Sequence, residues 1–270
     1  MKILFTDLDG TLLDDAKNIS PGNRAALERA LSAGHRVVIT TGRPLLSSLE
    51  QSRRLGLDGD GCYLIAYNGG VVYDFGKKER IYKRTLSIPL VLEIIRLCRE
   101  LGIHVQSYDD ETVLVEPDCD NETVRFYCRR IRMNYRVVPS FDTDMRVEPP
   151  KVLAIAPREQ LEQLYRALGR FDAELDYFYS TQTLLEIVPK GVSKGAAVAW
   201  MCQRMHIPLE DSIAAGDEEN DLSMIRTAGV GAAMANAIPM VKEAADYITQ
   251  HDNNHDGIAE IVEKFMLSKR

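Results

Sequence analysis

Two aspartates at the end of a short apolar run are the residues of this sequence best suited to chemistry. Asp7 and Asp9 directly follow Ile3, Leu4 and Phe5, a run that predicts a buried strand. Alternate residues of a strand point to one face, so two carboxylates that are ionised at neutral pH would lie close together. Two unit charges about 5 Å apart repel by roughly 3 kcal/mol at an effective dielectric constant near 20, so a cation or a shared proton is the natural partner. A surface turn of the Asp-x-Asp-Gly type is the alternative.

Other polar groups follow later apolar runs in the same way. Thr41 comes after a β-branched run, and Asp217 and Asp221 come after the apolar run 212–215. Lys194 stands in the first turn of a predicted helix, although a cation is favoured at the opposite end of a helix. A lysine in this place indicates a nearby anion, and a solvated surface lysine is the alternative.

The elements that must position these groups alternate between strand and helix over the first eighty residues. Strands are predicted at 3–5, 35–41 and 63–67, a helix at 20–34, another beginning at Pro44, and a returning hairpin strand at 71–73. This order indicates a parallel sheet covered on both faces. In an open sheet of this kind ligands bind outside the carboxyl ends of the strands, so the polar groups would meet in one crevice. Carboxylate oxygens that converge from two loops suit Mg²⁺.

The middle of the chain has a mixed pattern instead. Between residues 86 and 188 helices and strands occur without strict alternation, and the last eighty residues return to the first pattern. We therefore expect an α/β protein with a Rossmann-like core formed by residues 1–84 and 189–270, and an inserted α+β domain formed by residues 85–188.

The composition of the chain bears on which molecules the protein could bind and on where it is found. The 270 residues carry a formal net charge of −7, which argues against broad nucleic-acid binding. The five scattered cysteines favour a reducing compartment, and no apolar run is long enough to predict a membrane span or a signal peptide. We expect a cytoplasmic protein, as a monomer or small homo-oligomer, that binds neither nucleic acid nor membrane.

Taken together, four motifs resemble those of the haloacid dehalogenase superfamily in their order. They are Asp7-Leu8-Asp9-Gly10-Thr11, Thr41-Gly42-Arg43, Gly191-Val192-Ser193-Lys194-Gly195 and Gly216-Asp217-Glu218-Glu219-Asn220-Asp221. The large insertion between the second and third motifs is similar to the Cof-like branch of its phosphatases. Each motif alone is a weak to moderate signal, whereas the ordered set spans the chain and is specific. The resemblance also implies that the inserted domain acts as a cap.

The resemblance implies roles for individual residues. Asp7 would be the nucleophile that forms an aspartyl-phosphate, and Asp9 would be the general acid and base. Mg²⁺ would be held by Asp7, the backbone carbonyl of Asp9, and Asp217, with Asp221 in support. Phosphate would be bound by Thr41, Lys194, Asn220 and the backbone amides near Leu8 and Gly42, with Arg43 and Asn68 at the rim.

The function predicted from these roles is a Mg²⁺-dependent phosphatase of small phosphomonoesters such as sugar phosphates. A phosphomutase that uses the same Asp7 and Asp9 is the nearest alternative in mechanism. A non-catalytic regulatory protein that binds a phosphorylated metabolite is a third, although a binding protein gains nothing from a nucleophile and an acid.

Overall fold

The computed structural model describes residues 1–109 and 111–268, which fall into two compact units. Unit 1 comprises the described residues of Met1–Gly42, Ser48–Tyr82 and Ser193–Arg270, and unit 2 comprises those of Arg43–Ser47 and Lys83–Val192. The domain limits at 84/85 and 188/189 stay a prediction. Within the described residues, no helix is both long enough and apolar enough to cross a membrane.

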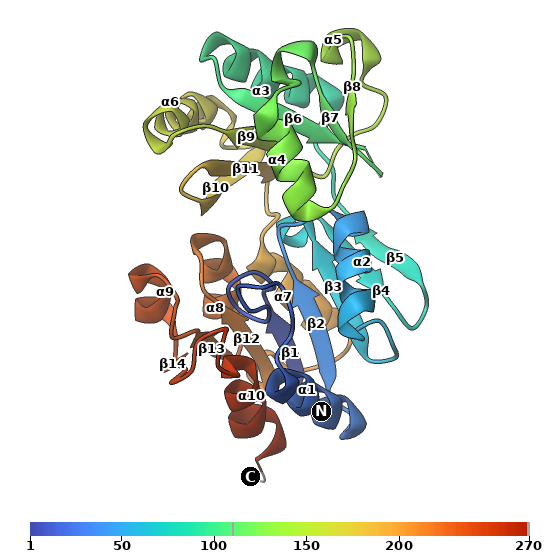
Figure 1. The fold of residues 1–270 in the computed structure, drawn as a ribbon, viewed down its shortest axis with the longest axis vertical. Helices are drawn as coiled ribbons and strands as arrows, with labels where there is room; N and C mark the ends of the chain where they lie inside the picture. Colours follow the sequence, from blue (N-terminus) through green and yellow to red (C-terminus); the bar gives the residue numbers. More distant parts are fainter. Residues whose placement is uncertain (110, 269–270) are drawn as a thin grey trace. The chain divides into compact units, whose positions relative to one another are not determined.

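Unit 1 is built on an eight-stranded sheet in the order β14-β13-β12-β1-β2-β3-β4-β5 (Figure 1). Its strands are β1 (Ile3–Thr6), β2 (Arg36–Thr40), β3 (Cys62–Ala66), β4 (Val71–Asp74), β5 (Glu79–Lys83), β12 (Ser212–Gly216), β13 (Val230–Ala233) and β14 (Tyr247–Ile248). The pairs from β14 to β3 are parallel, and β4 returns antiparallel to β3. The predicted parallel sheet and its hairpin are therefore present, with β1 in the interior of the sheet.

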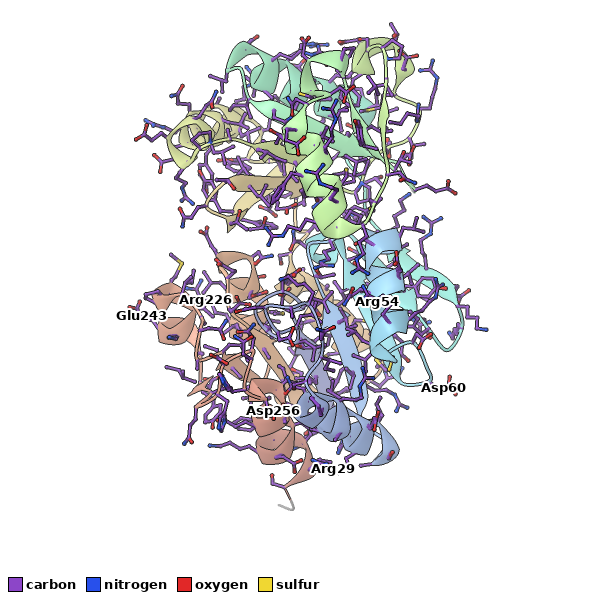
Figure 2. The ribbon with its side chains drawn as sticks, in the orientation of Figure 1. Arg29, Arg54, Asp60, Arg226, Glu243 and Asp256 are labelled. Atoms are coloured by element: carbon purple, nitrogen blue, oxygen red, sulfur yellow. The ribbon has the colours of Figure 1, made fainter. Side chains whose placement is uncertain are left out.

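Serine side chains cap two of the helices in unit 1. The helices of unit 1 are α1 (Pro21–Ser32), α7 (Lys194–Arg204), α8 (Leu222–Thr227), α9 (Pro239–Ala244) and α10 (Gly257–Val262), and α2 (Leu45–Leu55) belongs to unit 1 from Ser48 on. The Ser20 hydroxyl accepts the Asn23 N–H at the start of α1, and the Ser193 hydroxyl accepts the Ala196 N–H at the start of α7. In turn α1 packs on α10 and α7 packs on α8. Charged side chains such as Arg29 lie on the outside of these elements (Figure 2).

Unit 2 has a sheet of its own, in the order β10-β11-β9-β6-β7-β8. Its elements are α3 (Ile88–Glu100), β6 (His104–Tyr108), β7 (Val113–Val115), α4 (Glu122–Ile131), β8 (Tyr135–Val137), α5 (Phe141–Asp144), β9 (Val152–Ile155), α6 (Arg158–Leu168), β10 (Leu175–Thr181) and β11 (Leu184–Pro189). Every pair but β7–β8 is antiparallel. Apolar side chains of α3 and α6 pack with those of the strands in one core, as the mixed pattern predicts.

Candidate active site

The site begins at the carboxyl end of β1. The Asp7 N–H donates to the carbonyl of Ala215 at 3.0 Å, so the residue continues the pairing of β1 with β12 before the chain turns away. Because β12 and β2 run parallel to β1 on either side, Asp217 and Thr41 leave the sheet at the same edge. The side chain of Asp7 is buried, with 8% of the residue exposed.

Lys194 joins Asp7 from the first turn of α7. Its Nζ lies 2.5 Å from Asp7 Oδ1 and also donates to Asp221 Oδ1, and the residue is fully buried. Burial alone would lower the pKa of Lys194, but Asp221 and Asp7 outweigh that effect and raise it, so the ammonium is charged. The alternative of a solvated surface lysine is therefore wrong, and the lysine at a helix N-terminus faces carboxylates.

Two of the carboxylates of a buried aspartate cluster contact this ammonium. Asp7, Asp217 and Asp221 each offer a carboxylate oxygen, and these oxygens lie within 4.8 Å of one another. Burial raises the pKa of Asp7 from 3.8 to about 7, although the charge of Lys194 opposes this shift. Burial and the negative charge of Asp221 together raise the pKa of Asp217 from 3.8 to about 8. When all are ionised, three carboxylates and one ammonium leave an excess of two negative charges.

This donor set fits a small divalent cation. Mg²⁺ and similar hard cations prefer oxygen ligands such as carboxylates. A divalent cation would also balance the two excess negative charges of the cluster. The third carboxylate is fixed by the backbone, because Asp221 Oδ2 accepts the N–H of Asp217 at 2.9 Å and of Glu218 at 3.0 Å. We conclude that unit 1 contains a buried aspartate cluster suited to a metal ion.

Two residues of the loop after β1 lie against the side chain of Asp217. The Thr11 hydroxyl donates to Asp217 Oδ1 at 2.6 Å. Gly10 has a φ of +79°, and a Cβ added there would lie 2.3 Å from Asp217 Oδ2. Only glycine allows so close an approach of the backbone in this conformation.

Asp9 is placed differently from Asp7. Its side chain is 29% exposed, and its Oδ1 lies 2.8 Å from Nζ of Lys17, which stands eight residues later in the same loop. The accessible carboxylate of Asp9 thus lies two residues from the buried carboxylate of Asp7. In such an arrangement the buried group could bond to phosphorus while the accessible group exchanges a proton with a leaving group or with water.

The remaining predicted residues lie around the neighbouring loops. Thr41 is buried, its N–H donates to the Ile65 carbonyl at 2.8 Å, and its carbonyl accepts the Asn68 N–H at 3.0 Å. The Asn220 amide donates to Asn68 Oδ1 at 3.0 Å, so the second and fourth motifs are joined through Asn68. A Cβ added at Gly42 would meet Asn68 Nδ2 at 2.9 Å.

Leu8 and Arg43 contribute in other ways. Leu8 is fully buried, and its carbonyl accepts the Leu13 N–H at 2.8 Å, which closes the loop after β1. Arg43 belongs to unit 2, whereas the other predicted site residues belong to unit 1. The structure therefore brings together Asp7, Lys194, Asp217 and Asp221, with Asp9 on the adjoining loop.

Comparison with known families gives this arrangement a context. The profile of the family described as haloacid dehalogenase-like hydrolase matches residues 4–262. The chain belongs to the haloacid dehalogenase-like hydrolase family. The resemblance of the four ordered motifs to this family, and to its Cof-like branch, is thereby confirmed.

Relatives in this family support a phosphatase. The 5-amino-6-(5-phospho-D-ribitylamino)uracil phosphatase YcsE of Bacillus subtilis (strain 168) is 32% identical over 276 residues, which cover 99% of this chain and 96% of that protein. A haloacid dehalogenase-like hydrolase from Bacteroides thetaiotaomicron has a crystal structure that matches with a TM-score of 0.86 and 32% identity, over 97% of this chain and 98% of that one. The structure of the HAD subclass IIB sugar phosphatase BT4131 matches with a TM-score of 0.83 and 27% identity, over 98% and 99%. This haloacid dehalogenase-like hydrolase is therefore a phosphoric monoester hydrolase.

Sequence reasoning on this hydrolase missed two contacts of its site. Thr11 stands in the first motif, but nothing in its spacing indicates a hydrogen bond to Asp217, a residue 206 positions away. Lys17 lies outside every motif, and its backbone has a left-handed conformation that the sequence did not predict.

Proposed function

We propose that this phosphatase hydrolyses small phosphomonoesters with Mg²⁺, and that the phosphoryl group passes through Asp7. The observation that supports the proposal most is the burial of Asp7 in contact with Lys194 and close to the carboxylates of Asp217 and Asp221. An ionised carboxylate needs no activating base to attack phosphorus, and covalent catalysis divides one difficult displacement into two.

In the first displacement, a carboxylate oxygen of Asp7 bonds to phosphorus while the ester P–O bond breaks. The departing alcohol oxygen takes its proton from Asp9, which becomes ionised. In the second displacement water attacks the same phosphorus and gives a proton to Asp9, and the bond between phosphorus and Asp7 breaks. Phosphate leaves, and both aspartates return to their starting states. Proton transfer of this kind typically contributes about 10² to 10⁴ in rate.

Charge around Asp7 makes the first displacement feasible. Burial raises the pKa of Asp7 to about 7, and Lys194 supplies a positive charge that favours the ionised nucleophile. The proposed Mg²⁺ ligands are Asp7, the backbone carbonyl of Asp9, Asp217 and Asp221. When bound, the cation supplies the second positive charge, which further favours ionised Asp7 and neutralises the transferring phosphoryl group.

Phosphate oxygens are assigned to groups near Asp7. Proposed donors are Lys194, Thr41, Asn220 and the backbone amides near Leu8 and Gly42, with Arg43 as a further contact. Preorganised donors of this kind act where negative charge develops and therefore favour the transition state. The link from Asn220 to Asn68, whose N–H donates to the Thr41 carbonyl, supports a common role for these loops.

The proposed substrates are sugar phosphates or similar small metabolites. The names of the two relatives support this class, since one acts on a phosphorylated ribitylamino-uracil and the other is a sugar phosphatase. We also propose that the protein is cytoplasmic, because all five of its cysteines are free thiols in the structure. Residues 85–188 are proposed to form the cap.

Phosphate release from a panel of sugar phosphates, nucleotides and an aryl phosphate tests this function. We expect release that requires Mg²⁺, stops with a chelator and is lost in Asp7→Asn. Transfer of the phosphoryl group between substrate hydroxyls without net release would favour a phosphomutase. Tight binding of phosphate and metal with no turnover of any compound would favour a binding protein and contradict the proposal.

A further inference from the structure

The loop that carries Asp9 also carries a lysine that contacts it. Lys17 Nζ lies 2.8 Å from Asp9 Oδ1, and the side chains of the two residues are 42% and 29% exposed. Exposed ion pairs of this kind usually contribute little to the stability of a folded protein. Stability is therefore a poor explanation for the contact between Lys17 and Asp9.

The backbone at Lys17 adopts an uncommon conformation. Its φ is +64°, in the left-handed region that residues other than glycine seldom enter. A closed turn holds it there: the Lys17 N–H donates to the Asp14 carbonyl at 2.9 Å, and the Asp14 N–H donates to the Asn18 carbonyl at 2.9 Å. Asp14 Oδ1 in turn accepts the Asn18 N–H at 2.8 Å. Such a conformation persists only where its surroundings determine it, and here it directs the lysine to Asp9.

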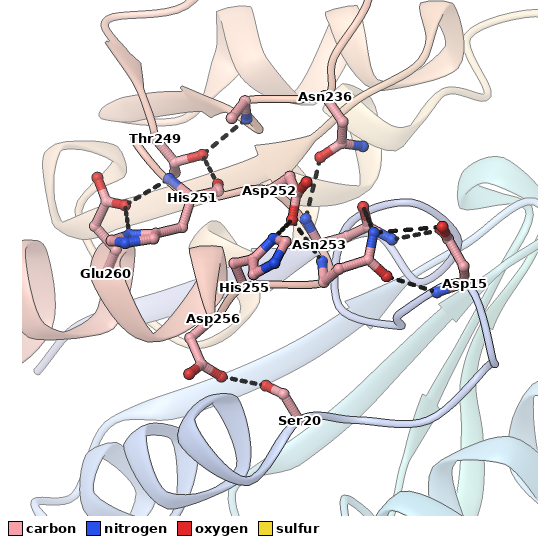
Figure 3. Close-up of polar contacts among 12 residues, drawn as sticks. Asp15, Ser20, Asn236, Thr249, His251, Asp252, Asn253, His255, Asp256 and Glu260 are labelled. Atoms are coloured by element: carbon pink, nitrogen blue, oxygen red, sulfur yellow. Dashed lines mark hydrogen bonds and ion pairs between the residues drawn. The ribbon is translucent and has the colours of Figure 1, made fainter.

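A segment near the end of the chain anchors the same loop, as Figure 3 shows around Asp15. The Asn253 amide donates to the Leu13 carbonyl at 3.0 Å and to Asp15 Oδ1 at 3.2 Å, and the Asn236 amide donates to the Gly10 carbonyl at 2.8 Å. Hydrogen bonds from Asn236 and Asn253 therefore hold the backbone of the loop between Asp9 and Lys17. The position of the Lys17 backbone relative to Asp9 is thereby restrained.

We propose that Lys17 is the positioning residue for Asp9. By holding Oδ1, its ammonium fixes the rotation of the Asp9 carboxylate and thereby the direction of Oδ2, the oxygen that would exchange a proton with the leaving group and with water. This inference rests on the proposed function, because it needs Asp9 to be the general acid. A misplaced catalytic group can cost about 10²-fold in rate, so the contact matters for rate rather than for stability.

Substrates with different leaving groups test this role in Lys17→Met, which keeps an unbranched side chain up to the position of Cε and removes the ammonium. The value of kcat/KM reports the steps up to phosphoryl transfer. For a sugar phosphate, whose alcohol must be protonated as it leaves, we expect kcat/KM to fall about 30-fold. For p-nitrophenyl phosphate, whose leaving group departs as a stable anion, we expect a loss below about threefold. A general structural defect would lower both values equally.

Three further variants make the test specific. Lys17→Arg keeps a cation and should recover most of the loss. Lys17→Met added to Asp9→Asn should cause no further loss, since the two residues act as one unit. Lys78→Met is the matched control, because Lys78 is an exposed lysine of unit 1 that also has a left-handed φ, of +57°, and it should behave as the native chain.

The outcomes separate the two proposals. Equal losses for both substrates, no loss for either, or additive losses in the double variant would overturn the role of Lys17. If Asp9→Asn shows the loss that depends on the leaving group while Lys17→Met does not, the inference fails and the proposed function stands. If Asp7→Asn retains phosphate release, the proposed function itself fails.

Discussion

Removing the charge of Lys194 is the perturbation whose effect follows most directly from the geometry. The ammonium lies 2.5 Å from Asp7 Oδ1, so a phosphoryl group carried by Asp7 would lie within about 4 Å of it. Opposite unit charges at about 4 Å stabilise one another by about 4 kcal/mol at an effective dielectric constant of 20. That free energy corresponds to about a thousandfold in rate, so Lys194→Met should lower kcat by about 10³.

The assay is kcat for an aryl phosphate at saturating Mg²⁺, with circular dichroism to show that the variant is folded. Lys194→Arg keeps the charge with a different shape and should lose less than Lys194→Met, while Lys78→Met should match the native chain. If folded Lys194→Met kept more than about a tenth of the native kcat, the electrostatic role given to Lys194 would be refuted.

Three further predictions concern the aspartate cluster and the buried ion pair of Lys151 and Glu186 in unit 2. The folded pKa values of Asp7 and Asp217, about 7 and about 8, lie above the unfolded value of 3.8, so the metal-free folded state binds more protons than the unfolded state across that range. Its free energy of unfolding should therefore fall as pH rises from 3.8 towards 8, and the Tm gained on adding Mg²⁺ should be larger at pH 8 than at pH 5; a Tm that rises with pH in chelator would contradict this. Gly10→Ala, whose new Cβ would displace the Asp217 carboxylate, should weaken Mg²⁺ binding about tenfold by calorimetry, and an unchanged Kd would show that the close approach is unimportant. Lys151→Met, which leaves Glu186 buried without the ammonium 2.7 Å away, should destabilise the protein by about 3–5 kcal/mol in denaturant unfolding, whereas Lys151→Met combined with Glu186→Leu should recover most of that loss.

The sequence predicted most of the elements that position the site, because their signals are local. Strong β-branched and apolar runs marked β1, β2, β3 and β12, and the hydroxyls of Ser20 and Ser193 marked the starts of α1 and α7. Short elements with mixed composition were missed, among them β5, with the sequence Glu-Arg-Ile-Tyr-Lys, and β8, with Tyr-Arg-Val. Such strands have partly or fully exposed side chains, so their residues carry little periodic signal.

The chemistry of the site was predictable as residue types but not as electrostatics. The motifs predicted Asp7, Asp217 and Asp221 as neighbours, because parallel strands end at one edge of a sheet. The burial of Lys194 was not predictable, since it depends on tertiary packing such as that of α7 against α8. The contact between Lys17 and Asp9 was not predictable either, because a left-handed backbone conformation at a lysine has no distinctive sequence signal.

Trapping the phosphoryl group on the enzyme tests the central claim most directly. The native chain would be mixed with substrate and Mg²⁺, quenched in acid within one turnover, digested, and analysed by mass spectrometry, with Asp7→Asn and Asp9→Asn treated in the same way. We predict one phosphoryl group on Asp7 in the native chain, none in Asp7→Asn, and accumulation in Asp9→Asn, because the second displacement lacks its base while an aryl leaving group needs no acid. Turnover by the native chain with no phosphoryl group on Asp7 at any quench time would contradict the account.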